Sequence, residues 1–227
     1  MEGDYIIAAD GGYAQLASRG IEPDLVVGDF DSLGTVPEHL NIKRSPVEKD
    51  DTDMMIAVKH GLKLGIRAFI IDGGLGGRFD HTLANIQLLA YIANNGAYGV
   101  LLGRDICITV LRNGTISFSL CSGDEITRKA HECFIKDGGR AVHTYVSSAG
   151  PSHGNRISVF SVGDRAEGVT LTGLKYTLDN ATISCDYPIG ISNEFTGVPA
   201  TITVRDGCLA VMWQGGRDLL DGELWRT

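Results

Sequence analysis

The first half of the chain alternates short apolar runs with longer segments of helical periodicity. Four runs rich in β-branched or aromatic residues predict strands, at residues 5–9, 25–27, 68–71 and 100–102. Met55, Val58 and Leu62 repeat at spacings of three and four, which predicts a helix over 52–64 that ends before Gly65. This order is typical of parallel strands joined by crossover helices.

A second helix is predicted over 80–94, because Gly96 supplies a stop after an apolar periodic segment. Its buried face is expected to carry four apolar residues that recur on one side of a helix: Leu83, Ile86, Ala90 and Ala93. Both helices are therefore expected to pack on the same sheet.

The pattern changes after about residue 104. Apolar and polar residues alternate in 115–119, 156–160 and 201–204, with Gly, Asn and Asp turns between these runs. An antiparallel sandwich or barrel fits this spacing better than further strand–helix–strand units. The polar stretch 127–154 lacks such a pattern and is interpreted as an insertion.

The charge balance restricts the partners of the chain. Acidic residues outnumber basic ones by 28 to 20, which gives a formal net charge of −8 over 227 residues. Such a field repels polyanions, so we expect no nucleic-acid partner, and ATP is expected to need divalent cations. The five cysteines form no CxxC pair and favour reduced thiols in a cytoplasmic protein. Neither export nor a membrane partner is expected, because no basic–apolar leader and no run of about 18 apolar residues is visible.

Three of the four predicted strands end in an acidic, glycine-rich turn. These turns are Asp10-Gly11-Gly12, the segment 28–32 with Asp29 and Asp31, and Asp72-Gly73-Gly74. In an open parallel sheet they would converge at the carboxyl ends of the strands, where ligands bind. Mg²⁺ fits such a cluster, because it takes carboxylate oxygens together with those of a phosphate chain. Solvated turns explain any one loop more simply, but they explain three at the same edge less well.

A second acidic cluster lies at the start of the first predicted helix and comprises Asp50, Asp51, Thr52 and Asp53. An N-cap and the helix dipole account for one or two of these residues. They do not require three aspartates in four positions, so Asp50 and Asp53 are expected to face the ligand crevice.

A glycine-rich segment joins the third predicted strand to the second helix. Its paired glycines let the backbone approach a phosphate, and the helix start offers free N–H groups. Arg78 adds a cationic fork suited to transferring phosphoryl oxygens. The segment matches neither the P-loop nor the dinucleotide pattern. His81 is either a base or a ligand, although a histidine at a helix start is more often a capping or packing residue.

Four motifs occur in the first half in the order AADGG, VVGDFDS, KDDTD and GGRFDHTLANIQLL. Two more follow in the second half, GVTLTGLKYTLDN and GISNEF. In order and spacing they resemble the motifs of the thiamine pyrophosphokinase family. The resemblance covers about residues 4–104 and 169–213. The segment 113–155 is longer than the family's usual domain connection and is expected to hold the insertion.

The resemblance implies an α/β fold class with two domains. An N-terminal parallel-sheet α/β domain, 1–110, is expected to bind ATP and Mg²⁺ and to carry the catalytic residues. A C-terminal all-β sandwich domain, 111–227, is expected to bind thiamine and to dimerise. Because thiamine would lie between domains of different subunits, the implied partners are ATP, thiamine and a second copy of the chain, as a homodimer.

The family's functional residues map onto matching positions of this sequence. Metal ligands are expected at Asp29, Asp31, Asp50 and Asp53, and catalytic roles at Asp53, Arg78 and Asp80. Nucleotide contacts are expected at Asp10, Gly11, Gly12, Thr52, Gly77, Arg78 and His81. Thiamine contacts are expected at Ser192, Asn193 and Tyr176. Trp213 is a second aromatic candidate, and either ring could equally belong to the core.

The implied reaction is attack by the thiamine hydroxyl on the β-phosphorus of ATP, which releases AMP. Asp53 or Asp80 is expected to accept the hydroxyl proton, and the sequence does not choose between them. One alternative is a related pyrophosphokinase with another acceptor, such as a pterin, or a nucleotide hydrolase. Another is a non-catalytic homologue that binds thiamine or a nucleotide, against which the retained acidic positions argue.

Overall fold

The computed structural model describes residues 4–30, 39–44, 50–120, 135–137, 140–147 and 155–214. Internal contacts divide the chain into two compact units, Met1–Phe69 and Ile70–Thr227. The predicted boundary at residue 110 separates a nucleotide-binding domain from a thiamine-binding domain. The division into compact units does not test that boundary, which stays a prediction.

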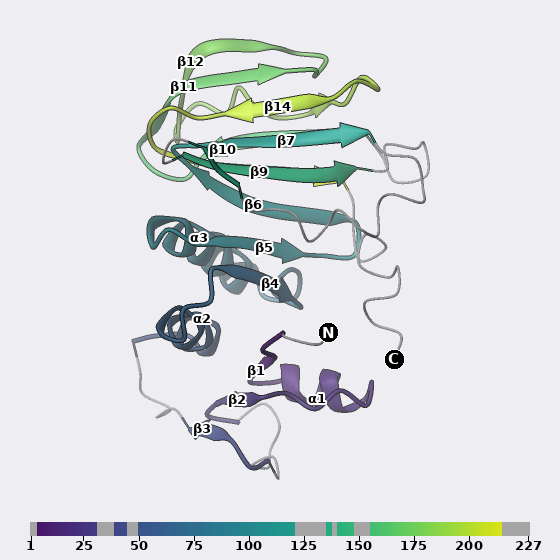
Figure 1. Cartoon of the computed structure of the whole chain (residues 1–227), viewed down its shortest axis with the longest axis vertical. Coiled ribbons are helices and arrows are strands. Elements are labelled where there is room, and N and C mark those ends of the chain that lie inside the picture. Colours follow the sequence, from purple (N-terminus) through teal and green to yellow (C-terminus); the bar gives the residue numbers. More distant parts are fainter. Residues whose placement is uncertain are drawn as a thin grey trace. The chain divides into compact units, whose positions relative to one another are not determined.

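The first unit is built on a small parallel sheet in the order β1-β2-β3. Its strands are β1 (Ile7–Ala9), β2 (Leu25–Gly28) and β3 (Ile42–Arg44), and its helices are α1 (Gly12–Ala17) and α2 (Asp53–Lys63) (Figure 1). Both strand pairs are parallel. The strand–helix order predicted this for β1 and β2, whereas β3 was not among the predicted strands. Ala8, Val26 and Phe30 form its small buried core.

Helix α2 confirms the predicted helix over 52–64. Thr52 caps it, since its hydroxyl accepts a hydrogen bond from Met55 N at 3.2 Å. Val58 is buried as the pattern required. Gly61 is buried as well, because a Cβ at this position would lie 2.7 Å from the Phe69 ring. The glycine at position 61 therefore allows α2 to lie close to Phe69 in the strand that follows.

The second unit contains two six-stranded sheets. The first has the order β13-β10-β15-β6-β5-β4. Its strands are β4 (Ala68–Asp72), β5 (Tyr98–Leu102), β6 (Ile106–Arg112), β10 (Arg156–Ser161), β13 (Asn193–Glu194) and β15 (Cys208–Gln214). The arrows of β4 and β5 point the same way in Figure 1, as the helix between them requires.

The predicted single sheet of four parallel strands was wrong in one respect. The runs at 68–71 and 100–102 pair in a different sheet from the runs at 5–9 and 25–27. After β5, a short turn returns the chain antiparallel as β6. This turn extends the sheet of β4 and β5 into the strands of the second half.

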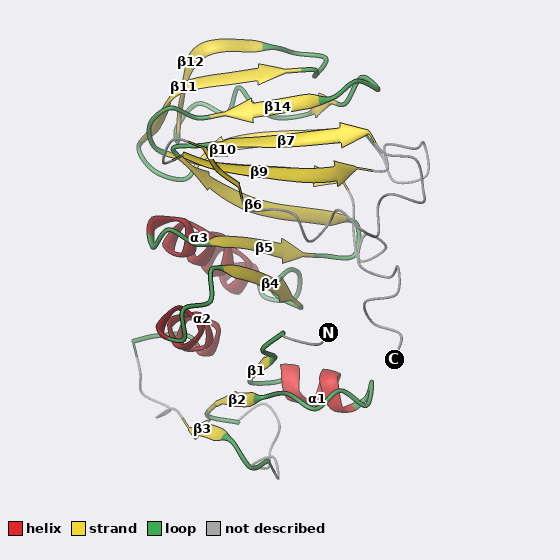
Figure 2. Ribbon diagram, viewed as in Figure 1, coloured by secondary structure: helices red, strands yellow, loops and turns green. Residues whose placement is uncertain are grey.

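The other sheet of this unit has the order β12-β11-β14-β7-β9-β8 (Figure 2). Its strands are β7 (Thr115–Leu120), β8 (Ile135–Asp137), β9 (Arg140–Ser147), β11 (Arg165–Thr172), β12 (Leu178–Ser184) and β14 (Ala200–Thr203). Buried residues of both sheets share one core, in which the ring centroids of Phe118 and Trp213 lie 5.5 Å apart. Three strands of the predicted insertion 113–155 join this sheet, namely β7, β8 and β9. The insertion's residues 121–134, 138–139 and 148–154 lie outside the described residues.

Helix α3 (Phe79–Asn94) confirms the second predicted helix, and its predicted face in part: Ala90 is buried, Ile86 and Ala93 are half-buried, and Leu83 is exposed. Its buried residues are Leu88, Leu89, Ala90 and Ile92. Leu83 is half exposed, because the helix packs on β5 and β6 chiefly through its second half. The start of α3, where the glycine-rich segment joins it, is therefore left accessible.

Three cysteines lie among the described residues, Cys107, Cys185 and Cys208, and all three are free thiols. Burial raises the pKa of Cys107 to about 12, so this thiol is an inert part of the core. Within the part of the chain that the structure describes, no helix is long and apolar enough to cross a membrane.

Candidate active site

Two of the three acidic turns meet at the carboxyl end of the first sheet. Asp10 follows β1 and Asp29 follows β2, and both are half-buried. Asp10 N donates to Val27 O at 2.8 Å. A Cβ on Gly28 would lie 3.2 Å from Asp10 Cα, so a glycine is needed for these turns to approach so closely. The turn at Asp72 belongs to the second unit, and its convergence with the other two stays a prediction.

Gly11 and Gly12 follow Asp10 directly. Gly11 has helical backbone angles and Gly12 begins α1. A Cβ on Gly12 would meet no atom within 4 Å, so the space around this residue is open. The predicted nucleotide contacts of these glycines therefore have room, but no close packing requires glycine at position 12.

The second acidic cluster is divided by an ion pair. Lys59 Nζ donates to both carboxylate oxygens of Asp51, at 2.6 and 2.8 Å. Asp50 is exposed and Asp53 is half-buried in the first turn of α2. Lys59 thus balances the charge of Asp51, which was not among the predicted ligands. The Thr52 side chain serves as the N-cap of α2. If Thr52 also contacts the nucleotide, as predicted, the same residue has to fill both roles.

The predicted metal ligands are only partly described. Asp31 lies outside the described residues, and among those described no three His, Cys, Asp or Glu side chains are grouped to hold a metal ion. Mg²⁺ usually takes only one or two carboxylates and completes its shell with water and phosphate oxygens. The neighbouring turns of Asp10 and Asp29 offer carboxylate donors of that kind. The donor chemistry therefore fits Mg²⁺ bound together with a phosphate chain.

The glycine-rich segment of the second unit is folded tightly before α3. Gly73, Gly76 and Gly77 have φ values of 75°, 89° and 63°, which favour glycine. Asn85 Nδ2 donates to Gly74 O at 2.8 Å and fixes the segment to the helix. This arrangement leaves the first N–H groups of a 16-residue helix beside a compact loop, a geometry that suits a phosphate.

Arg78 and Asp80 form a bidentate pair at the start of α3. Arg78 Nη2 donates to Asp80 Oδ2 at 2.6 Å, and Arg78 Nε donates to Oδ1 at 3.2 Å. The hydrogen bond from Arg78 lowers the pKa of the Asp80 carboxyl below its usual value. The same bond raises the pKa of Arg78. His81 is exposed, and its backbone N also donates to Asp80. The pair holds a solvent-accessible guanidinium in one orientation.

The three predicted thiamine contacts lie together in the second unit. Asn193 is 5% exposed, and its side chain hydrogen-bonds to the backbone of Tyr176, whose ring is 60% exposed. Ser192 has a φ of 59°, and its N donates to Ser158 Oγ at 3.1 Å. Trp213 is buried in the core, so of the two aromatic candidates Tyr176 alone is accessible. Their role in binding thiamine stays a prediction.

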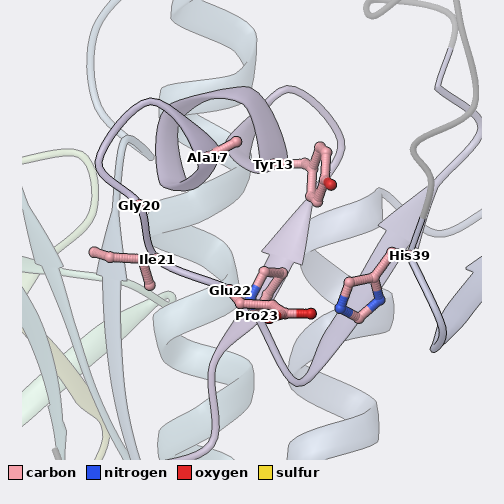
Figure 3. Close-up of a pocket in the computed structure, with 7 residues that line it drawn as sticks. All are labelled: Tyr13, Ala17, Gly20, Ile21, Glu22, Pro23 and His39. Carbon is pink, nitrogen blue, oxygen red and sulfur yellow. The ribbon is translucent and has the colours of Figure 1, made fainter.

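A pocket of about 210 Å³ lies elsewhere in the first unit (Figure 3). Tyr13 and His39 face it, and their ring centroids are 6.4 Å apart. Glu22 and Pro23, which also line it, lie just before β2, whereas Tyr13 lies at the start of α1. Neither Asp10 nor Asp29 lines this pocket.

Sequence reasoning missed three polar contacts around the predicted residues. They are Lys59 with Asp51, Asn85 with Gly74, and Lys175 with Glu194, whose Nζ and Oε1 lie 3.0 Å apart. Asn85 left a weak signal, as an amide within an apolar helix. The two ion pairs left none, because their partners are eight and nineteen residues apart.

Two family models match the chain. Residues 2–100 match the thiamin pyrophosphokinase catalytic domain, and residues 144–209 match the thiamin pyrophosphokinase vitamin B1 binding domain. The first match contains the acidic turns and the start of α3. The second contains Tyr176, Ser192 and Asn193.

Proteins with sequences or structures similar to this chain are also named thiamine pyrophosphokinase. A thiamine pyrophosphokinase of Bacillus subtilis is 28% identical over 213 residues, covering 91% of this chain and 85% of the relative. Thiamine pyrophosphokinase 3 of Oryza sativa subsp. japonica is 26% identical over 201 residues, covering 82% of this chain and 63% of the relative. The crystal structure of thiamine pyrophosphokinase from Bacillus subtilis has a TM-score of 0.72 at 26% identity, covering 94% of this chain and 89% of that one. That from Geobacillus thermodenitrificans has a TM-score of 0.69 at 25% identity, covering 95% and 88%.

Proposed function

The chain belongs to the thiamine pyrophosphokinase family, and we propose that it transfers a pyrophosphoryl group from ATP to the hydroxyl of thiamine. The products would be thiamine diphosphate and AMP. The observation that carries this proposal is the presence, in one chain, of matches to both the catalytic and the vitamin B1 binding model.

The reaction breaks one phosphoanhydride bond and forms one ester bond. The thiamine hydroxyl oxygen attacks the β-phosphorus, and the bond from that phosphorus to the oxygen shared with the α-phosphate breaks. AMP leaves with the bridging oxygen, and the hydroxyl proton passes to a base. The protein has little covalent chemistry to perform, so alignment and charge stabilisation supply the catalysis.

Arg78 is the residue best suited to stabilise the moving phosphoryl oxygens. Its guanidinium is exposed at the start of α3, and Asp80 holds it in place through two hydrogen bonds. Asp80 therefore orients Arg78, and both of its carboxylate oxygens already accept hydrogen bonds from that guanidinium. Of the two candidates, this leaves Asp53 as the proposed acceptor of the hydroxyl proton.

The nucleotide site would be completed by Mg²⁺. The residues proposed to hold it are Asp29, Asp31, Asp50 and Asp53, whose carboxylates supply the oxygen ligands that this ion prefers. When bound, Mg²⁺ neutralises part of the charge of the phosphate chain and helps to fix its geometry. Asp10, Gly11 and Gly12, with Gly77 and His81 in the second unit, would contact the nucleotide.

Acceptor choice separates thiamine pyrophosphokinase activity from that of a related enzyme with another acceptor. With ATP and Mg²⁺ held constant, thiamine should support AMP release, whereas a hydroxymethyl pterin should leave the rate at the level without acceptor. Coupled detection of AMP measures both. AMP release with the pterin at the rate seen with thiamine would overturn the assignment of thiamine.

We also propose that the active species is a homodimer, with thiamine between the nucleotide half of one subunit and the β half of its partner. Tyr176 and Ile191 are 60% and 57% exposed, so both side chains are available to a ligand or to a partner subunit. In a twofold dimer each subunit would then contribute to both sites.

Subunit exchange tests the shared site. An Asp29→Ala protein and a Tyr176→Ala, Ser192→Ala protein should each lose most activity. Mixed and exchanged, they should recover about a quarter of the wild-type rate, because half of the dimers then carry one intact site of two. Tagged chains verify the exchange. As a control, Asp29→Ala mixed with Asp53→Ala should recover nothing, because both changes lie on the nucleotide side. Verified heterodimers without recovery would mean that each site is built within one chain.

A further inference from the structure

Two short segments of the second unit run antiparallel beside each other. Leu174 and Phe195 form an isolated bridge, and Lys175 N donates to Glu194 O at 2.9 Å. The next residues along the two segments are Tyr176 and Asn193, and Ser192, which precedes Asn193, has a φ of 59°.

The side chain of Asn193 hydrogen-bonds to both backbone groups of Tyr176. Its Oδ1 accepts from Tyr176 N at 2.9 Å, and its Nδ2 donates to Tyr176 O at 2.6 Å. Oδ1 also accepts from Glu194 N at 2.9 Å. Asn193 is 5% exposed, so both ends of its amide are used inside the protein. Few other side chains can do this, because aspartate cannot donate and glutamine is one methylene longer.

Tyr176, whose backbone Asn193 holds, has an exposed side chain. The Tyr176 ring is 60% exposed, although its backbone N–H and C=O are both fixed. Lys175 Nζ lies 5.6 Å from the centre of this ring and 3.0 Å from Glu194 Oε1. The ring therefore already faces a cation, and the backbone that carries it is fixed before a ligand stacks on it, which lowers the entropy cost of binding.

We propose that Asn193 is a positioning residue for the acceptor subsite. It holds the backbone of Tyr176 so that the exposed ring can receive a cationic heteroaromatic acceptor, and it does not touch that acceptor itself. That the acceptor is thiamine rests on the proposed function. Asn193 thus acts through Tyr176, in place of the direct contact that its position in the motif first indicated.

A double-mutant cycle tests this relation. The KM for thiamine should rise about tenfold in Tyr176→Ala, the upper range for loss of one aromatic contact. It should rise by a similar factor in Asn193→Ala, with kcat within about twofold of wild type. The double variant should be no worse than Tyr176→Ala, because residues that act as a unit are not additive. A product of the two effects, about a hundredfold, would show a direct contact by Asn193 and overturn the proposal. An unchanged KM in Asn193→Ala would overturn it as well.

Further variants keep the test valid if Asn193→Ala does not fold. Asn193→Asp keeps the two accepted bonds, but its second oxygen faces Tyr176 O where Nδ2 donated, so its KM should rise by about threefold or more. The matched control is Asn113→Asp, in another turn of the same unit, where Oδ1 accepts from Gly207 N at 2.9 Å. Its KM should not change. Should Asn193→Ala fail to fold, an unchanged KM in Asn193→Asp would contradict the proposal.

Hydrogen exchange at the Tyr176 amide separates this inference from the proposed function, since it needs no substrate. Exchange should be at least about tenfold faster in Asn193→Ala than in wild type, because the amide loses its acceptor. Unchanged exchange would refute the role of Asn193 even in an enzyme that converts thiamine. Faster exchange in a protein that fails to convert thiamine would instead refute the proposed function alone.

Discussion

Replacing Arg78 with alanine is expected to lower kcat by about a hundredfold or more, the usual effect of removing one donor to a transition-state charge. The guanidinium lies at the start of α3 and is oriented by Asp80, with a shortest distance of 2.6 Å. Its side chain is 72% exposed, so its loss should leave folding intact. Initial rates at varied ATP and thiamine concentrations would separate kcat from KM. Arg78→Lys should recover only part of the rate, because lysine lacks the planar fork.

The matched control for this change is Arg67→Ala. Arg67 is also exposed, and its guanidinium donates to the carbonyl oxygens of Leu62 and Ile66. Its loss should leave kcat unchanged. An Arg78→Ala enzyme with kcat close to that of the Arg67→Ala control would remove Arg78 from the mechanism.

Removal of divalent metal is expected to abolish both ATP binding and turnover. The chain carries a net charge of −8 and places the turns of Asp10 and Asp29 side by side, so bare triphosphate should be repelled. Calorimetric titration with ATP should show binding with Mg²⁺ and none in excess EDTA, and added Mg²⁺ should restore it. Equal affinity for ATP in EDTA would contradict the proposed role of the metal.

The elements with strong periodicity could be predicted from the sequence. Helices α2 and α3 begin and end within two residues of the predicted ranges, because a cap or a glycine marks their ends. The short elements α1 and β3, of six and three residues, carry too few positions to show a period. The buried face of α3 was predicted only in part, since apolar residues surround much of this helix and tertiary packing selects among them.

The site could be predicted only as a set of candidate residues. The order of strands and turns sufficed to place Asp10 near Asp29, because parallel neighbours end at the same edge. The hydrogen bonds of Asn193 to Tyr176 join residues 17 positions apart through a side chain, and no periodic pattern records such a contact. Burial of Trp213 and exposure of Tyr176 likewise depend on the packing of two sheets, which composition alone does not determine.

Identification of the products by mass tests the central claim most directly. The purified chain is incubated with ATP, Mg²⁺ and thiamine, and the adenine and thiamine products are quantified together. Transfer of a pyrophosphoryl group predicts thiamine diphosphate and AMP in equal amounts, and neither product when thiamine or Mg²⁺ is omitted. Thiamine monophosphate with ADP, or AMP formed without any phosphorylated thiamine, would contradict the assignment of this chain as a thiamine pyrophosphokinase.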